Sequence, residues 1–165
     1  MRESKSRGPA VCAGGTHGLN KMHVVIVGCG RVGATLATML GRGGHTVAIV
    51  DQNSEAFDRL PEGFRGETVI GTGIDEDVLR RAGIERADAF AAVMTADNRN
   101  IMAAQVAKHV FQVPKVVCRI YDPLREETYR DLGLETICPT TIGAQQIVDC
   151  FVSHTATALA GTMER

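Results

Sequence analysis

One stretch of this chain constrains its fold more than any other: a short apolar strand that runs directly into three spaced glycines. Residues 24–27 are a continuous β-branched run, with the length expected of a strand buried on both faces. Gly28, Gly30 and Gly33 follow as G-x-G-x-x-G, and residues 34–40 are typical of a helix. The first glycine turns the chain tightly, the second lets backbone approach a pyrophosphate, and the third lets helix and strand pack closely. The helix N-terminus adds free N–H groups and a partial positive charge that favour phosphates.

An acidic residue follows these glycines at the spacing typical of dinucleotide-binding units. Asp51 ends the next apolar run, 18 residues beyond Gly33. A carboxylate there accepts hydrogen bonds from a ribose diol and repels a 2′-phosphate, and Gln52 and Asn53 add no arginine to neutralise that phosphate. The glycines alone are weak evidence, but strand, glycines, helix, second strand and terminal acid together predict a nucleotide site. NAD(H), ATP or ADP is expected to bind, and NADP(H) is not.

Composition excludes several other classes of protein. The chain has 165 residues, 44% of them hydrophobic, which fits one domain with a real core. A net charge of −1 and an aromatic fraction of 4% disfavour nucleic-acid binding. Apolar runs are too short to cross a bilayer, and the five scattered cysteines have no disulfide or zinc-ligand spacing. We expect a cytoplasmic protein with no nucleic-acid partner, no bound metal and no direct membrane insertion.

Strand and helix patterns alternate along the chain from residue 22. Residues 1–21 are basic, rich in Gly and Ser and without periodicity, so a disordered tail is expected there. The expected strands are 22–27, 46–50, 67–70, 88–94, 115–120 and 135–138. The expected helices are 32–42, 54–60, 75–82, 97–112, 123–132 and 140–160. This alternation predicts an α/β fold, a Rossmann-type doubly wound parallel sheet in the order 3-2-1-4-5-6, with a C-terminal crossover helix.

The ligand crevice of such a sheet lies at the carboxyl ends of its strands. Residues that follow the strands are therefore the candidate binding residues. They are Gly28, Cys29, Gly30, Arg31, Val32, Gly33, Asp51, Gln52, Gly71, Thr72, Gly73, Thr95, Asp97, Asn98 and Arg119. No catalytic residue is assigned among them.

Several of these residues also have a structural interpretation. Arg31 either contacts phosphate or is a solvated arginine at the helix start. Arg119 ends a buried strand, where it either contacts phosphate or ribose or pairs with a nearby aspartate such as Asp97. Asp97 and Asn98 either cap the following helix or face the site. Cys29 lies where a helix N-terminus could lower its pKa, although no base is nearby in sequence.

Over about residues 22–160 the sequence resembles a known family. The motifs are Gly28-x-Gly30-Arg31-x-Gly33, Asp51, the stretch from Gly71 to Leu79, Asp97-Asn98-Arg99-Asn100, Val117-Cys118-Arg119-Ile120 and the stretch from Leu132 to Pro139. They resemble the TrkA-N or RCK (KTN) nucleotide-binding domain of bacterial Trk/Ktr-type potassium uptake regulators. Two positions differ from the usual family pattern, namely Thr72 in place of Asp and Thr140 in place of Glu.

The resemblance implies a regulatory subunit or domain rather than an enzyme. Members of the resembling family bind NAD(H), ATP or ADP, form homodimers or rings through the last helix, and gate a membrane potassium transporter or channel. The chain would then be cytoplasmic and associated with the membrane only through its partner. An NAD-dependent oxidoreductase is the alternative, but the expected crevice rim carries no Tyr-x-x-x-Lys or His–Asp arrangement for proton transfer. An isolated dinucleotide-binding domain of unrelated role is a further alternative.

The last predicted helix extends beyond the nucleotide-binding domain expected at residues 22–139. A helix of about 20 residues spans roughly 30 Å, comparable with the diameter of a small domain. Apolar residues continue at helical spacing along residues 140–160, at Ile142, Ile147, Val148, Phe151, Val152, Thr155 and Leu159. An exposed apolar stripe usually marks an interface. Residues 140–165 are therefore expected to form a crossover helix and tail that make a two-fold dimer.

Overall fold

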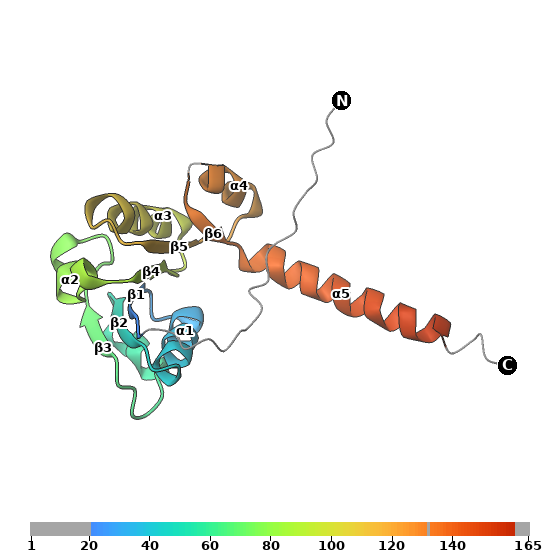
Figure 1. Cartoon of the computed structure of the whole chain (residues 1–165), viewed down its shortest axis with the longest axis horizontal. Helices are drawn as coiled ribbons and strands as arrows, with labels where there is room; N and C mark the ends of the chain where they lie inside the picture. Colours follow the sequence, from blue (N-terminus) through green and yellow to red (C-terminus); the bar gives the residue numbers. More distant parts are fainter. Residues whose placement is uncertain (1–20, 132, 161–165) are drawn as a thin grey trace.

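The computed structural model describes residues 21–131 and 133–160, with side chains up to residue 152. The expected N-terminal tail lies outside the described residues. One parallel sheet has the strand order β3-β2-β1-β4-β5-β6 (Figure 1). The strands are β1 (His23–Val27), β2 (Thr46–Asp51), β3 (Glu67–Ile70), β4 (Ala89–Ala92), β5 (Lys115–Arg119) and β6 (Glu135–Ile137). The predicted fold class and strand order are confirmed.

Helical segments connect the strands. They are α1 (Arg31–Arg42), η1 (Ser54–Arg59), α2 (Glu76–Arg81), η2 (Ile84–Arg86), α3 (Asp97–Gln105), η3 (Val106–Val110), α4 (Pro123–Asp131) and α5 (Pro139–Ala160). In Figure 1, α1 lies on the opposite side of the sheet from α2 and α3.

Strand β1 packs against helices on both of its faces. Val24 and Ile26 belong to the apolar cluster that includes Ala37 of α1. Val25 and Val27 belong to the other cluster, which includes residues of α2 and α3. Because successive side chains of a strand point to opposite faces, a strand in this position must be apolar throughout. The β-branched run Val24–Val27 satisfies this requirement.

Two helical segments differ from the prediction in kind. The segment after β2 is a 3-10 helix rather than an α-helix. The helix after β4 is α-helical only through Gln105 and continues as a π-helix from Val106 to Val110. The prediction for the helix after β3 is wrong by one residue, because Asp75 caps it: its carboxylate accepts the backbone N–H groups of Asp77 at 2.8 Å and Val78 at 3.3 Å.

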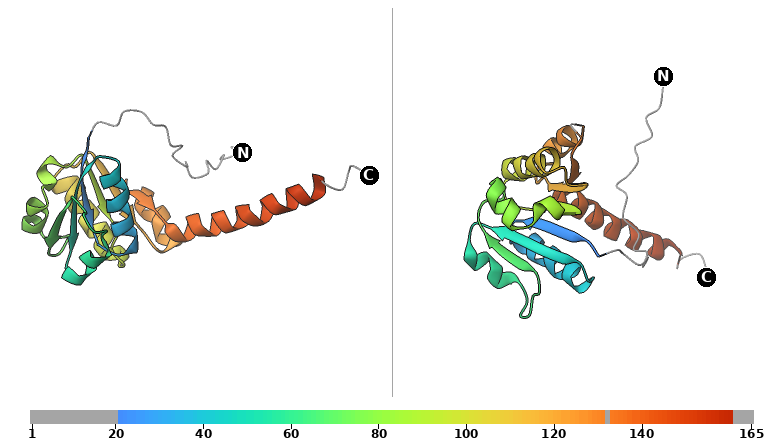
Figure 2. Two further views of the ribbon diagram at one scale, coloured as in Figure 1. Left: turned by 90° about the horizontal axis from the view of Figure 1, so that it is seen from below. Right: turned by 60° about the vertical axis from the view of Figure 1, so that its left-hand side comes forward.

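Helix α5 begins beside β6 and runs away from the sheet for most of its length (Figures 1 and 2). Its exposed large apolar residues are Ile142, Ile147, Val148, Phe151 and Val152. The side chains at positions 155 and 159, which we also assigned to the apolar stripe, lie outside the described residues. Within residues 21–131 and 133–160, no helix combines the length and the apolar character that a bilayer crossing requires.

The close approach of α1 to the preceding loop is testable in the unfolding equilibrium. A Cβ atom at Gly33 would overlap the carbonyl oxygen of Gly28, which is backbone and has little freedom to move. Gly33→Ala is therefore expected to lower the free energy of unfolding by about 2–3 kcal/mol or more. Gly41→Ala on the same helix is the matched control, since its Cβ would meet only the Phe64 ring at 4.0 Å. That variant should raise the free energy by roughly 0.5–1 kcal/mol. Urea denaturation measures both, and equal effects would contradict the assigned packing.

Candidate functional site

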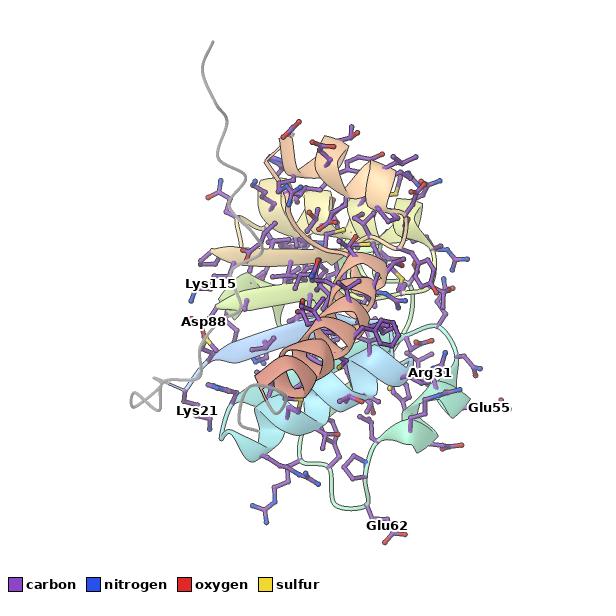
Figure 3. All side chains as sticks on the ribbon, turned by 90° about the vertical axis from the view of Figure 1, so that its right-hand side faces the viewer. Lys21, Arg31, Glu55, Glu62, Asp88 and Lys115 are labelled. Atoms are coloured by element: carbon purple, nitrogen blue, oxygen red, sulfur yellow. The ribbon has the colours of Figure 1, made fainter. Side chains whose placement is uncertain are left out.

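A cleft with a volume of about 370 Å³ opens at the carboxyl ends of the strands. Figure 3 shows Arg31 and Glu55, which follow β1 and β2, at the opposite end of the sheet from Asp88 and Lys115, which lie where β4 and β5 begin. The lining residues are Val27, Gly28, Cys29, Gly30, Arg31, Val32, Val50, Asp51, Gln52, Asn53, Ala56, Arg59, Gly71, Gly73, Val93, Met94, Thr95, Arg99 and Arg119.

The glycine loop forms the floor of the cleft. Gly28 has φ +102° and donates its N–H to the Val50 carbonyl at 2.8 Å, so it turns the chain where a side chain would be strained. Gly30 has no neighbouring atom within 4 Å of an added Cβ, which leaves the backbone open to the cleft. Helix α1 starts there with the bond from the Ala34 N–H to the Gly30 carbonyl, 2.9 Å. No side chain caps α1, and its first turn has no acidic residue, so its first N–H groups remain available to an anion.

The carboxylate of Asp51 joins this loop to the end of β2. One carboxylate oxygen accepts the Cys29 N–H at 2.7 Å, and the other accepts the Asn53 N–H at 2.9 Å. Each oxygen keeps a lone pair for a further donor such as a ribose hydroxyl. The carboxylate is thus held at the cleft wall by backbone groups from two elements.

Four guanidinium groups surround the cleft. Arg31 lies at the start of α1, Arg59 at the end of η1, Arg99 on α3 and Arg119 at the end of β5. Among the described residues, none of the four forms an ion pair with a carboxylate. The Nε atom of Arg119 is buried and has no hydrogen-bond partner there, although its guanidinium lies 5.3 Å from the Tyr121 ring.

Two arginines outside the cleft, Arg80 and Arg125, have carboxylate partners in the described part of the chain. Arg80 contacts Glu76 at 2.8 Å, Asp77 at 3.0 Å and Glu85 at 3.5 Å. Glu76 and Asp77 raise the pKa of the Arg80 guanidinium above its usual value, mainly through the hydrogen bond to Glu76. The four arginines that line the cleft have no such partner among the described residues, and their positive charge makes the cleft attractive to a polyanion.

Eleven of the fifteen candidate residues line the cleft, and four do not. Gly33 lies beneath the loop, where it permits the contact with Gly28. Thr72 does not line the cleft, and its carbonyl accepts the Asp75 N–H at 3.2 Å in the turn before α2. The glycine after it, Gly73, packs so closely on Val27 that a Cβ would overlap that side chain.

Asp97 and Asn98 neither cap α3 nor line the cleft. The N-cap residue is Ala96, without a side-chain cap. The carboxylate of Asp97 accepts the backbone N–H groups of Tyr121 at 2.8 Å and Asp122 at 3.3 Å, and it lies 3.9 Å from the Arg125 guanidinium. Asn98 accepts a hydrogen bond from the same guanidinium at 2.5 Å. The predicted capping role is thus wrong, because Asp97 joins α3 to the loop after β5 and Asn98 joins it to Arg125 of α4. A role of either side chain in binding stays a prediction.

Other cleft residues were missing from the sequence prediction. Asn53, Arg59 and Arg99 line the cleft, and Arg99 reaches across it to within 3.5 Å of the Gln52 amide oxygen. Arg99 belongs to the segment Asp97–Asn100 that the resemblance singled out, which was the only available signal. Arg59 carried none, because an exposed arginine at the end of a short helix is ordinary in sequence.

Asn100 is fully buried, and its side chain bonds to the backbone of two residues that line the cleft, Met94 and Arg119. Its amide oxygen accepts the Met94 N–H at 2.7 Å, and its amide nitrogen donates to the carbonyls of Met94 at 2.8 Å and Arg119 at 2.9 Å. All the hydrogen-bonding groups of the amide thus have partners, which makes its burial acceptable. The side chain holds the end of β4 against the end of β5, where Arg119 projects.

The thiol of Cys29 is less acidic than the sequence suggested. Burial and, after it, the negative charge of Asp51 raise its pKa to about 11, while the charge of Arg59 acts in the opposite direction. A lowered pKa, which the sequence left open as an alternative, is therefore not found. What Cys29 contributes to the cleft is its backbone N–H, which is bonded to Asp51. Cys118 and Cys138 are buried, as expected of core residues.

The sheet order, the glycine loop and the terminal acid of β2 together define a Rossmann-type α/β domain. Comparison with known proteins then assigns the chain more narrowly. Residues 24–139 match the family model of the TrkA-N domain, and the chain belongs to this family.

One relative is the Trk system potassium uptake protein TrkA of Streptomyces coelicolor. It is 51% identical over 127 residues, which cover 77% of this chain and 57% of the relative. The chain thus spans little more than half the length of that protein.

Solved structures agree on the fold. The TrkA-N domain of the inner membrane protein ybaL from Escherichia coli superposes with a TM-score of 0.70 at 17% identity, covering 79% of this chain and 97% of that one. The GsuK channel bound to NAD superposes with a TM-score of 0.60 at 22% identity, and the match covers 73% of this chain and 22% of that one. GsuK bound to ADP superposes with a TM-score of 0.62 at 22% identity, and the match covers 74% of this chain and 32% of that one. Identities this low bear on the fold alone.

The raised pKa of Cys29 predicts slow alkylation of this thiol. With a pKa of about 11 rather than the ordinary 9.0, the thiolate fraction at pH 8 is about 100-fold lower. Iodoacetamide at pH 8 should therefore modify the exposed Cys150 and leave Cys29 nearly untouched, as measured by peptide mass spectrometry. The denatured chain serves as the control, in which both react. Alkylation of Cys29 at the rate of Cys150 in the folded protein would contradict this assignment.

Proposed function

We propose that this chain is a regulatory nucleotide-binding domain that binds NAD(H) or ATP/ADP in the cleft and gates a potassium transporter or channel. The observation that carries the proposal is the set of four unpaired guanidinium groups around an uncapped helix N-terminus in a TrkA-N family member. The S. coelicolor relative is named as a potassium uptake protein, and GsuK structures carry NAD or ADP.

The cleft supports a nucleotide rather than a simple anion. Its floor offers backbone N–H groups and Gly30 for a phosphate or pyrophosphate. Its wall offers the Asp51 carboxylate for a ribose diol. Apolar side chains such as Val50, Ala56 and Val93 line the remainder, where a base is less exposed to water.

We further propose that the domain acts by binding and not by catalysis. Among the described residues that line the cleft, none is His, Tyr or Lys. Both oxygens of Asp51 already accept backbone N–H groups, and the pKa of Cys29 is raised. These features disfavour the oxidoreductase alternative, which needs a group that transfers a proton beside the nicotinamide. Hydride turnover with a panel of small alcohols and NAD would favour that alternative instead.

The assembly that we propose uses α5, with a boundary near residue 139 between the nucleotide-binding domain and the dimerisation helix. Ile147, Val148 and Val152 are 57%, 49% and 64% exposed on a helix that leaves the domain (Figure 2). A second copy of this chain is the proposed occupant of that stripe, with further copies completing a ring. The potassium transporter subunit would then hold the assembly at the cytoplasmic face of the membrane.

The proposed function predicts which nucleotides bind and what Arg31 does. Calorimetry should detect the binding of NAD, ADP and ATP to the intact chain. Arg31→Ala should weaken ATP by about 1.5–3 kcal/mol, roughly ten- to hundredfold, and AMP by less, because the guanidinium faces the terminal phosphates. Arg42→Ala is the control, since it lies at the other end of α1 and does not line the cleft. Equal losses for ATP and AMP would make Arg31 purely structural, and no binding of any nucleotide would overturn the proposal.

If α5 forms the proposed dimer, substitution of one apolar residue on this helix should lower the molecular mass of the assembly in solution. The intact chain should scatter light as a dimer at high micromolar concentration, because water-exposed apolar residues on α5 are buried by association. Ile147→Glu should shift it toward the monomer, while Gln146→Glu, which adds the same charge one position earlier, should not. An intact chain that remains monomeric would remove the dimer.

A further inference from the structure

We propose that a second hollow, at the opposite end of α1 from the nucleotide cleft, binds a small organic carboxylate with an apolar body. This second hollow has a volume of about 270 Å³ and lies between the end of α1, the start of β2 and the loop at residues 61–66. None of its lining residues lines the nucleotide cleft. The proposal is therefore independent of the proposed nucleotide function.

The loop that forms one wall of the second hollow is a tight turn packed against β2. The Phe64 N–H donates to the Pro61 carbonyl at 3.0 Å, and Gly63 within this turn has φ +77°. A Cβ atom at Gly66 would overlap both the Phe64 ring and the Val47 carbonyl, so the loop lies directly on the strand. The wall is thus held in place by the backbone, and small-molecule sites are usually preformed in this way.

Two apolar side chains give the second hollow a surface for the body of a ligand. Val47 is buried, and the half-buried Phe64 packs against the same apolar cluster as α1. A Cβ atom at Gly41 would lie 4.0 Å from the Phe64 ring, so the ring faces bare backbone at the end of α1. A ring or aliphatic group placed there is removed from water. The volume is smaller than the 370 Å³ of the nucleotide cleft, which favours a small ligand.

Positive charge exceeds negative charge around the second hollow. Arg42 at the end of α1 and Arg65 of the loop both line it, and neither forms an ion pair among the described residues. Glu62, at the tip of the loop in Figure 3, is the one carboxylate among the described residues that line it. Two guanidinium groups against one carboxylate favour a ligand with a single negative charge. A guanidinium binds a carboxylate through two parallel hydrogen bonds, so the two groups match in shape as well as in charge.

The end of α1 does not oppose an anion in the usual way. A helix C-terminus normally carries a partial negative charge on its free carbonyls. Here the carbonyls of residues 39–41 already accept the backbone N–H groups of residues 43–45. His45 accepts the Met22 N–H at Nδ1, 3.2 Å, so the neutral ring carries its proton on Nε2 and adds a hydrogen-bond donor to the lining. The described residues that line the second hollow include no helix N-terminus, which favours a carboxylate over a phosphate.

The test uses benzoate as the probe and benzamide, which has the same shape without the charge, as its matched control. Titration of the intact, isotope-labelled chain is followed by two-dimensional NMR of the backbone N–H groups. Benzoate should shift the signals of Gly41, Gly63 and Gly66, which line the second hollow. We expect benzoate to bind about tenfold more tightly than benzamide, because only the anion pairs with the guanidinium groups. Acetate should also bind more weakly than benzoate, because it has the charge but no ring to place on Phe64.

Substitutions of the charged lining residues should act in opposite directions. Arg42→Gln and Arg65→Gln should each weaken benzoate binding, by about threefold to tenfold, because each removes a partner of the carboxylate. Glu62→Gln should strengthen binding, because it removes the charge that repels the ligand. The control is Arg130→Gln, an exposed arginine on α4 that does not line the second hollow, and it should leave the affinity unchanged.

Three results would overturn the proposal. The first is the absence of shifts at Gly41, Gly63 and Gly66, or shifts confined to Gly28 and Gly30 of the nucleotide cleft. The second is binding of benzamide as tight as that of benzoate. The third is an affinity for benzoate that both arginine substitutions leave unchanged. Each of these results leaves the proposed nucleotide function intact, because the two sites share no residue.

Discussion

The close contact between Gly28 and Gly33 fixes where α1 begins, and the cleft depends on that position. A side chain at Gly33 would overlap the Gly28 carbonyl, so only glycine lets the helix start this near the strand. The helix axis then points its free N–H groups into the space above the carboxyl ends of β1 and β4. The positive φ of Gly28 provides the turn that this geometry requires. A single backbone contact thus places the anion-binding end of α1 before any charged side chain contributes.

Two side chains then hold the remaining walls to this floor. Asp51 connects the loop after β1 to the end of β2, and Asn100 connects the end of β4 to the end of β5. Both act through backbone groups, so they define the shape of the cleft independently of what its exposed side chains do. Asn100 is the more constrained, because an amide without partners in the core would be costly. The exposed arginines, in contrast, are free to adjust to a ligand.

Those parts of the molecule that follow from local spacing were predictable from the sequence. The apolar run before Gly28, the glycine spacing and Asp51 lie within one strand–helix–strand unit, where each residue constrains the next. Asp97 was misplaced because its partners, the N–H groups of Tyr121 and Asp122, belong to a distant segment. Arg59 was missed for a related reason: only folding brings an exposed helical arginine to the cleft. Side chains that bridge elements distant in sequence leave no periodic pattern.

The route from the cleft to α5 is short. Arg119 ends β5 at the cleft, and Tyr121, two residues later, stacks near its guanidinium at 5.3 Å. The Tyr121 carbonyl accepts the Thr140 hydroxyl of α5 at 2.9 Å, and its N–H is bonded to Asp97. An anion that pairs with Arg119 competes with the stacking on Tyr121, and Tyr121 is joined to the first turn of α5. Occupancy of the cleft would therefore bias the orientation of α5 only if the bonds of Tyr121 differ between the ligand-free and ligand-bound states.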